Sequence, residues 1–296
     1  MNATGWGENV ADGAAEKFIS SLGMFVWCEC PCRNSTSHGE LVSFFSHRRR
    51  VINTGSSGIE KVLRYMFEQG FLTEEQALVI GDIKPAELKE WVGTGHIASE
   101  KSFFDVPTLY FPTDKAHRFL WSRGVKVYVE WLRRPPEKNE VHDRRLTDLR
   151  ILFEQMGYRA WQSERCLHQR GMKKVRPDAI VEIGKRKVVI ELEMTMKGSS
   201  KYEKRFRFYA DHSAIDAVLY IVATPEQRKR ILKLSEGQGK VSVALLRNVS
   251  EHGRDAYVEH PVFPGAVRLW KFLEMIGVKR FLNAHDFQSE RRTKDE

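Results

Sequence analysis

The sequence lacks the long apolar stretches of membrane-spanning proteins and the abundant cysteines of disulfide-rich ones. No uninterrupted apolar run reaches the roughly 18 residues of a membrane span, and the 296 residues include only four cysteines. The first 16 residues do not follow the basic-then-apolar order of a signal peptide, because Gly, Asn, Asp and Glu interrupt them. We therefore expect a cytoplasmic protein with free thiols and no membrane partner.

The composition is that of a folded, basic protein. Hydrophobic residues make up 42% of the chain and aromatic residues 11%, which excludes wholesale disorder. The formal net charge is +9, and between Arg165 and Arg207 thirteen Lys and Arg residues face only five acidic ones. This local excess predicts a polyanionic partner, with DNA as the simplest candidate. A solvated basic face is the alternative.

Residues 1–50 form an N-terminal extension whose structure the pattern does not define. Cys28, Cys30 and Cys32 lie in it. They could chelate zinc, although their spacing differs from the usual pairs, or serve as small core residues. Three basic residues at its end are candidates for contacts with DNA phosphates: Arg48, Arg49 and Arg50.

Residues 51–134 show the order of a winged helix-turn-helix domain. Caps and stops predict a helix from Ser56 or Ser57 to Gly70, and a second helix after a capping box at Thr73. A third helix is expected over 84–92, two short strands over 97–111 and a further helix after residue 113. The third helix would read DNA, but its charges nearly cancel, so a protein-contact role is the alternative.

A Pro-rich linker over 135–141 precedes a second domain over 142–282. There the pattern predicts an α/β fold, with a mixed sheet flanked by helices. Helices are expected near 142–156, 200–210, 225–234 and 266–282, and strands near 158–163, 178–183, 187–195, 217–223 and 241–246. Residues 283–296 are expected to be a disordered tail.

The segment 176–195 carries the strongest chemical signal. It predicts a β-hairpin in which Asp178 can lie across from Glu191, while Glu193 shares a strand face with Glu191. Converging carboxylates favour a hard cation such as Mg²⁺ or Mn²⁺, which activates water and polarises a phosphodiester. An exposed strand edge with solvated acids is the alternative.

These residues resemble the PD-(D/E)XK nuclease core, and more specifically the replication-relaxation family and the MobC-type relaxases of mobile plasmids. The resemblance covers most of residues 55–250 and implies a winged helix followed by a nuclease-like domain. Its motifs lie in a helix–strand–hairpin–helix frame: His142, Asp148-Leu-Arg150, Ser163-Glu164, Arg176-Pro-Asp178, Glu191-x-Glu193, Lys197, Tyr202 and Tyr209.

The resemblance implies that Asp178 and Glu191 are metal ligands and that Glu164 is a further ligand or a water-orienting acid. Glu193 stands where the nuclease pattern has a lysine. It is therefore either a third ligand or a degenerate lysine site. In the second case Lys197, or else Lys201, would supply the cation that stabilises charge on the phosphate.

The basic helix after Glu193 is expected to contact DNA. Together with Arg176, the predicted contacts are Lys201, Lys204 and Arg205. Tyr202 and Tyr209 share a face of this helix and could act as covalent nucleophiles, or simply cover the sheet. His142 and His212 are expected to be satisfied helix-end histidines rather than ligands.

Three functions are compatible with these patterns. The first is a metal-dependent, relaxase-like DNA nickase at a plasmid or mobile-element origin, acting in mobilisation or replication on double-stranded or locally melted DNA. Its partners could include accessory mobilisation or replication proteins. The second is a non-catalytic DNA-binding regulator that keeps the nuclease core as a scaffold. The third is an endonuclease subunit of a restriction or transposition system.

Overall fold

The computed structural model describes residues 57–102, 107–127, 137–158, 160–169, 175–261 and 265–277. The chain divides into the units Met1–Gly55 and Ser56–Glu296, and all described residues belong to the second. The predictions for the N-terminal extension, its three cysteines, Arg48, Arg49 and Arg50, and the tail 283–296 therefore lie outside the described residues.

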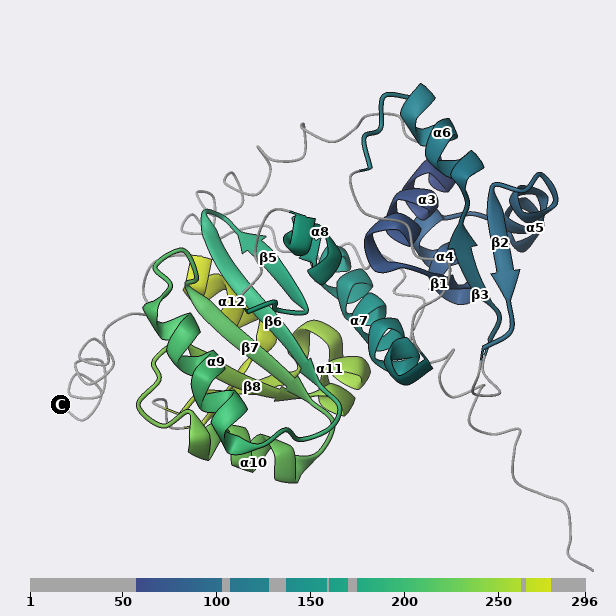
Figure 1. Cartoon of the computed structure of the whole chain (residues 1–296). Coiled ribbons are helices and arrows are strands. Elements are labelled where there is room, and N and C mark those ends of the chain that lie inside the picture. The colour runs from purple at the N-terminus through teal and green to yellow at the C-terminus, as the bar shows by residue number, and fades with distance from the viewer. Residues whose placement is uncertain are drawn as a thin grey trace, which may run out of the picture. The chain divides into compact units, whose positions relative to one another are not determined.

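The first part of the described chain, here called the N-terminal lobe (residues 57–127), contains a small antiparallel sheet and four helices (Figure 1). Its strand order is β1-β3-β2. The helices and the two longer strands predicted from the sequence are confirmed, with β1 as an addition. The elements are α3 (Gly58–Gln69), β1 (Leu72–Thr73), α4 (Glu74–Gly81), α5 (Pro85–Gly93), β2 (Ile97–Glu100), β3 (Leu109–Pro112) and α6 (Asp114–Ser122).

Local signals explain the helix boundaries in this lobe. The Ser57 hydroxyl accepts a hydrogen bond from the Glu60 N–H, and Gly70 ends α3 with a φ of 103°. Thr73 forms the predicted capping box with Gln76 at the start of α4. Trp121 of α6 is 56% exposed. Ala116 and Leu120 form the buried stripe of α6. Trp121 lies beside this stripe, so its indole faces solvent.

The second part is mixed α/β, with a seven-stranded sheet in the order β10-β9-β8-β7-β6-β5-β4. Strands β6, β7 and β8 are parallel to one another, and the remaining pairs are antiparallel. Its elements are α7 (Glu137–Gln155), β4 (Trp161–Ser163), α8 (Glu164–Gln169), β5 (Ala179–Ile183), β6 (Arg186–Glu193), α9 (Ser199–Asp211), β7 (Ala217–Val222), α10 (Pro225–Leu234), β8 (Val241–Leu245), α11 (Leu246–His252), η2 (Gly253–Asp255), β9 (Tyr257–Glu259), β10 (Ala266–Arg268) and α12 (Leu269–Gly277).

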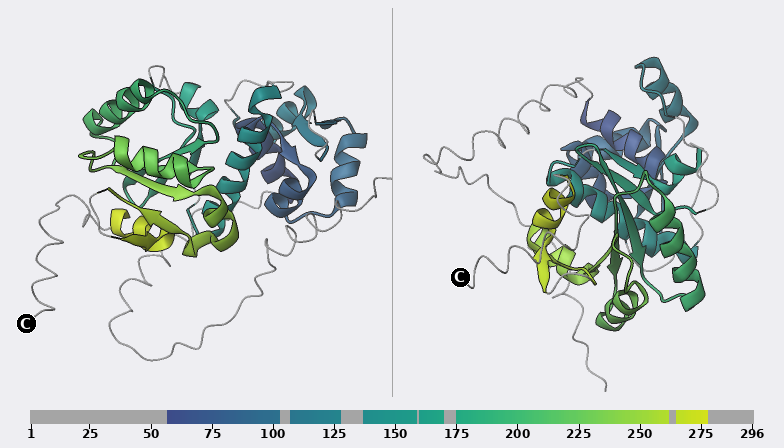
Figure 2. Two further views of the ribbon diagram at one scale, coloured as in Figure 1. Left: turned by 90° about the horizontal axis from the view of Figure 1, so that it is seen from below. Right: turned by 90° about the vertical axis from the view of Figure 1, so that its left-hand side faces the viewer.

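Helices cover both faces of this sheet (Figure 2). On one face Ile190 and Leu192 of β6 pack in a core with residues of α7 and α12. On the other face Val189 packs in a second core with Tyr202 and Tyr209 of α9. Because side chains alternate along a strand, the two glutamates of β6 fall on the face that α9 covers. The middle of the sheet is therefore dry on both sides.

The observed boundaries differ from the predicted ones at several places. Strand β4 begins at Trp161 rather than near residue 158, and β6 ends at Glu193 rather than near residue 195. Helix α7 begins at Glu137, so residues 137–141, which we assigned to the linker, are helical. Glu140 lies in the first turn of this helix, whose free N–H groups attract negative charge. The helix expected from residue 266 begins instead at Leu269, because Ala266, Val267 and Arg268 pair with β9.

Polar contacts connect the N-terminal lobe to α7. The Gln76 amide donates a hydrogen bond to Asp148 over 2.7 Å. Arg150 is almost fully buried, binds Glu68 and Glu154, and stacks on the Tyr65 ring with its guanidinium 3.6 Å from the ring centroid.

None of the helices in the described part of the chain combines the length and apolar character needed to cross a bilayer.

Candidate functional site

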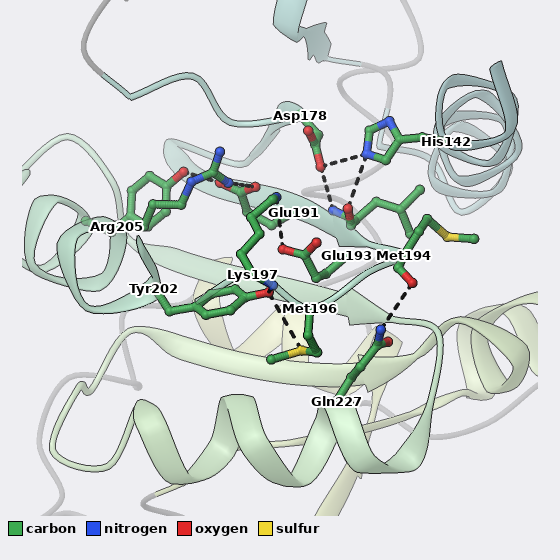
Figure 3. Close-up of polar contacts among 12 residues, drawn as sticks. His142, Asp178, Glu191, Glu193, Met194, Met196, Lys197, Tyr202, Arg205 and Gln227 are labelled. Carbon is green, nitrogen blue, oxygen red and sulfur yellow. Dashed lines mark hydrogen bonds and ion pairs between the residues drawn. The ribbon is translucent and has the colours of Figure 1, made fainter. Parts of the chain in front are cut away.

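The predicted hairpin is present as β5 and β6 (Figure 3). Its turn includes Gly184 with a φ of 63°, a conformation that glycine adopts without strain. Ala179 pairs with Ile190, and continuing this antiparallel register by one residue places Asp178 beside Glu191. The hairpin therefore brings the two predicted metal ligands to adjacent positions at one end of β5.

Asp178 is held by the backbone of β6 and by His142 of α7. One carboxylate oxygen of Asp178 accepts the Leu192 N–H over 2.7 Å and lies 3.4 Å from His142 Nε2. The other ring nitrogen of His142 lies 3.1 Å from an Asp143 oxygen. Burial lowers the pKa of His142, but the hydrogen bonds and charges of Asp143 and Asp178 outweigh it and raise the pKa to about 10. A charged imidazolium thus fixes Asp178.

Glu191 is buried and engaged through both carboxylate oxygens. One oxygen contacts Arg205 Nη1 and the other contacts the Tyr209 hydroxyl, both from α9. Burial and the charge of Asp178 raise the pKa of Glu191, whereas the charge of Arg205 and the hydrogen bond from Tyr209 lower it and favour the carboxylate. Arg205, which we predicted to contact DNA, therefore points inward and neutralises this carboxylate.

Glu193 is paired with the lysine that follows the strand. Lys197 Nζ lies 3.0 Å from a Glu193 oxygen, and the carboxylate side chain is 5% exposed against 40% for the lysine. The Lys197 N–H also donates to the Tyr202 hydroxyl over 3.1 Å. The chain thus folds back after β6 and places the Lys197 ammonium beside the Glu193 carboxylate.

The tyrosines of α9 cover the sheet, which was the structural alternative. Tyr202 and Tyr209 are 1% and 0% exposed. Burial raises the pKa of both phenols, and the contact of Tyr209 with Glu191 adds to the effect there. Both hydroxyls are therefore protonated and enclosed, which opposes a role as a nucleophile.

The remaining predicted residues contact Asp178, Glu191 and Glu193 less directly. The Glu164 N–H donates to the Asp178 carbonyl over 2.9 Å, and the Glu164 carboxylate lies 3.6 Å from Arg176 Nη1. Burial and the charge of Asp178 raise the pKa of Glu164. Lys201 and Lys204 are exposed on α9. His212 follows the end of that helix and stacks on Phe208, so it fits the expected structural role.

Two groups at the site were not predicted to take part. The partly exposed His142 lies 3.4 Å from Asp178, a contact that depends on how α7 packs. Tyr220 of β7 pairs with Glu191 in the ladder, and its hydroxyl is buried without a hydrogen-bond partner among the described residues. The motif spacing around His142 offered a weak signal for the first, while nothing in the local pattern indicated the second.

The donor set suits a hard divalent cation in its chemistry. Asp178 and Glu191 offer carboxylate oxygens, and the buried Tyr220 hydroxyl of β7, opposite Glu191 in the ladder, has no hydrogen-bond partner among the described residues and could bind a water molecule. Within the described residues no three His, Cys, Asp or Glu side chains form a ready cluster. A cation bound at Glu191 must therefore share or displace Arg205.

A hollow of about 620 Å³ lies elsewhere, in the N-terminal lobe between α3, α5 and α6. Trp91 and Phe119 line it together with Lys84, Glu87 and Arg123. Its lining mixes both signs of charge, which agrees with the near neutrality of the third predicted helix. The hollow does not include the carboxylates of the hairpin.

Comparison of the chain with family models, curated proteins and solved structures found no match.

Proposed function

We propose that the protein is a metal-dependent DNA-nicking enzyme, relaxase-like, with a winged-helix N-terminal lobe and a PD-(D/E)XK-type second part. The observation that carries this proposal is the placement of Asp178 beside Glu191 across the β5–β6 hairpin. The order α7, β4, the hairpin and α9 supports it, because it follows the frame of the family that the sequence resembles. The expected setting is a plasmid or mobile-element origin in the cytoplasm.

In this proposal Asp178 and Glu191 hold Mg²⁺ or Mn²⁺, with Glu193 and Glu164 nearby. The bound ion would lower the pKa of a water molecule and polarise the phosphodiester. The charged His142 keeps the Asp178 carboxylate oriented. Lys197 stabilises negative charge that develops on the phosphate, because its ammonium is already held at Glu193 and is still partly exposed.

DNA would approach along the exposed side of α9. Lys201 and Lys204 present their ammonium groups there, and Arg176 lies at the hairpin entrance beside Glu164. These charges attract the phosphate backbone without regard to sequence. The N-terminal lobe, joined to α7 by the contact between Gln76 and Asp148, would place the site on its target.

A second function, a non-catalytic DNA-binding regulator, is favoured by one observation. Arg205 and Tyr209 engage both oxygens of Glu191. A carboxylate satisfied in this way can stabilise the fold without binding an ion. In that case α9 still binds DNA, and the hairpin serves as a scaffold.

The discriminating experiment incubates the protein with supercoiled plasmid and Mg²⁺ or Mn²⁺, using Asp178→Asn and Glu191→Gln as variants. We expect relaxed circles from the wild type, and rates lower by at least a hundredfold in both variants. Glu236→Gln, at an exposed position after α10, removes the same charge outside α9; it is the matched control and should nick normally.

Other products would support other functions. Linear plasmid would indicate an endonuclease subunit that cuts both strands. A gel shift without any cleavage would favour the regulator. Metal-dependent nicking that persists unchanged in both Asp178→Asn and Glu191→Gln would refute the assignment of the site.

A further inference from the structure

Arg205 occupies the position of a cation at Glu191. Its guanidinium contacts one carboxylate oxygen (Figure 3), while the Tyr209 hydroxyl contacts the other. The Glu191 side chain is 3% exposed, whereas that of Arg205 is 26% exposed. The carboxylate is thus enclosed by the protein, but the guanidinium can still be reached from solvent.

The surroundings of Arg205 favour its release towards an anion. It lies on α9 between the two exposed positions Lys204 and Arg207, and Lys201 is one helical turn away. These like charges repel the Arg205 guanidinium and so weaken its ion pair with Glu191. They also attract phosphate groups to the same helix. An arginine can bind phosphate through two parallel hydrogen bonds, and these would replace its ion pair with the Glu191 carboxylate.

We propose that Arg205 is an internal counter-cation that competes with the divalent ion for Glu191, and that a phosphate of bound DNA draws it away. This inference rests on the proposed function, because it concerns the regulation of the same site. Its consequence is that DNA and the metal ion bind cooperatively. By thermodynamic linkage, each must strengthen the binding of the other by the same factor.

The size of the effect follows from the population of the open state. If Arg205 leaves Glu191 free in less than a tenth of the molecules, the apparent metal affinity is reduced at least tenfold. The first test measures Mn²⁺ binding without DNA by electron paramagnetic resonance of the free ion. Arg205→Gln should bind Mn²⁺ at least tenfold more tightly than the wild type.

Two variants control for charge and shape. Arg207→Gln removes the same charge from the exposed side of α9 and should bind Mn²⁺ as the wild type does. Arg205→Lys keeps a cation at the site and should stay within about threefold of the wild type. Equal or weaker Mn²⁺ binding by a folded Arg205→Gln would overturn the inference.

A second measurement keeps the test decisive if Arg205→Gln fails to fold. With EDTA present, Glu191→Gln should bind duplex DNA at least threefold more tightly than Asp178→Asn, because only the first releases Arg205. Both variants remove one negative charge, so the comparison isolates the guanidinium. Equal DNA affinities would refute the inference. Neither measurement uses cleavage, so a wild type that does not nick plasmid would count only against the proposed function.

Discussion

The pair between Glu193 and Lys197 offers a charge-exchange experiment that tests both the fold and the role of position 193. Glu193→Lys places a second ammonium against Lys197, at a carboxylate position that is 5% exposed. Lys197→Glu places a second carboxylate beside Glu193. The double variant Glu193→Lys with Lys197→Glu restores one charge of each sign, with the cation now on the strand.

The burial of the two partners sets the expected magnitudes. Breaking a fully buried pair costs about 3–5 kcal/mol, whereas exposed pairs contribute about 0.2–1 kcal/mol. Since Lys197 is 40% exposed and can turn to water, Glu193→Ala should cost only about 1–2 kcal/mol. Glu193→Lys should cost about 3 kcal/mol, because its ammonium is buried beside a like charge. The exchange should recover at least half of that loss.

The first assay is urea unfolding of the wild type, the two single charge variants and the double variant, analysed as a double-mutant cycle. The second is Mn²⁺-dependent nicking of supercoiled plasmid. We expect the exchanged protein to nick, because a cation still faces the phosphate from position 193. An exchanged protein no more stable than Glu193→Lys would show that the pair does not form. A stable exchanged protein that is as inactive as Asp178→Asn would instead identify Glu193 as a metal ligand.

Three further predictions follow from other contacts. The folded-state pKa of His142 is raised to about 10. The contribution of the protonated imidazole to the free energy of unfolding should therefore be complete below about pH 6.5 and lost as the pH rises through 10. The urea midpoints of the wild type and His142→Gln should therefore differ at pH 6 and converge above pH 10. Arg150→Met should cost about 3–5 kcal/mol in urea unfolding because it removes the almost fully buried cation that binds Glu68 and Glu154; a loss below 1 kcal/mol would contradict the buried network. DNA affinity should fall steeply with salt, and replacing Lys201 and Lys204 by Gln should reduce the logarithmic slope by about 2; an unchanged slope would exclude α9 from the interface.

Local chemistry made much of the fold predictable. Ser57, Thr73 and Gly70 define the ends of helices through contacts within a few residues, so their sequence patterns are sufficient. The helix over Pro225–Leu234 begins after a second capping box, at Thr224, and was predicted with both ends correct. The hairpin register that aligns Asp178 with Glu191 is equally local.

Elements and contacts that depend on distant segments were not predictable in this way. The apolar run from Ala266 suits a helix or a strand, and only the pairing with β9 decides for a strand in its first three residues. Likewise, a basic residue on α9 can face DNA or the sheet. The rotation of the helix over its core turns Arg205 towards Glu191, and no pattern within α9 indicates that choice.

The parallel pairing of β6 with β7 has a consequence for the order of folding. The β5–β6 hairpin needs only a short turn, but β7 joins β6 after the whole of α9 has crossed the sheet. On a β5–β6 hairpin alone Glu191 would be hydrated, and the docking of α9 with Arg205 and Tyr209 is what encloses it. A buried carboxylate without these partners is strongly disfavoured. A form in which α9 packs on the sheet in another orientation, without Arg205 and Tyr209 at Glu191, would therefore be less stable than the native form. The same residue that would hold the metal thus also helps to select the correct closure of the sheet during folding.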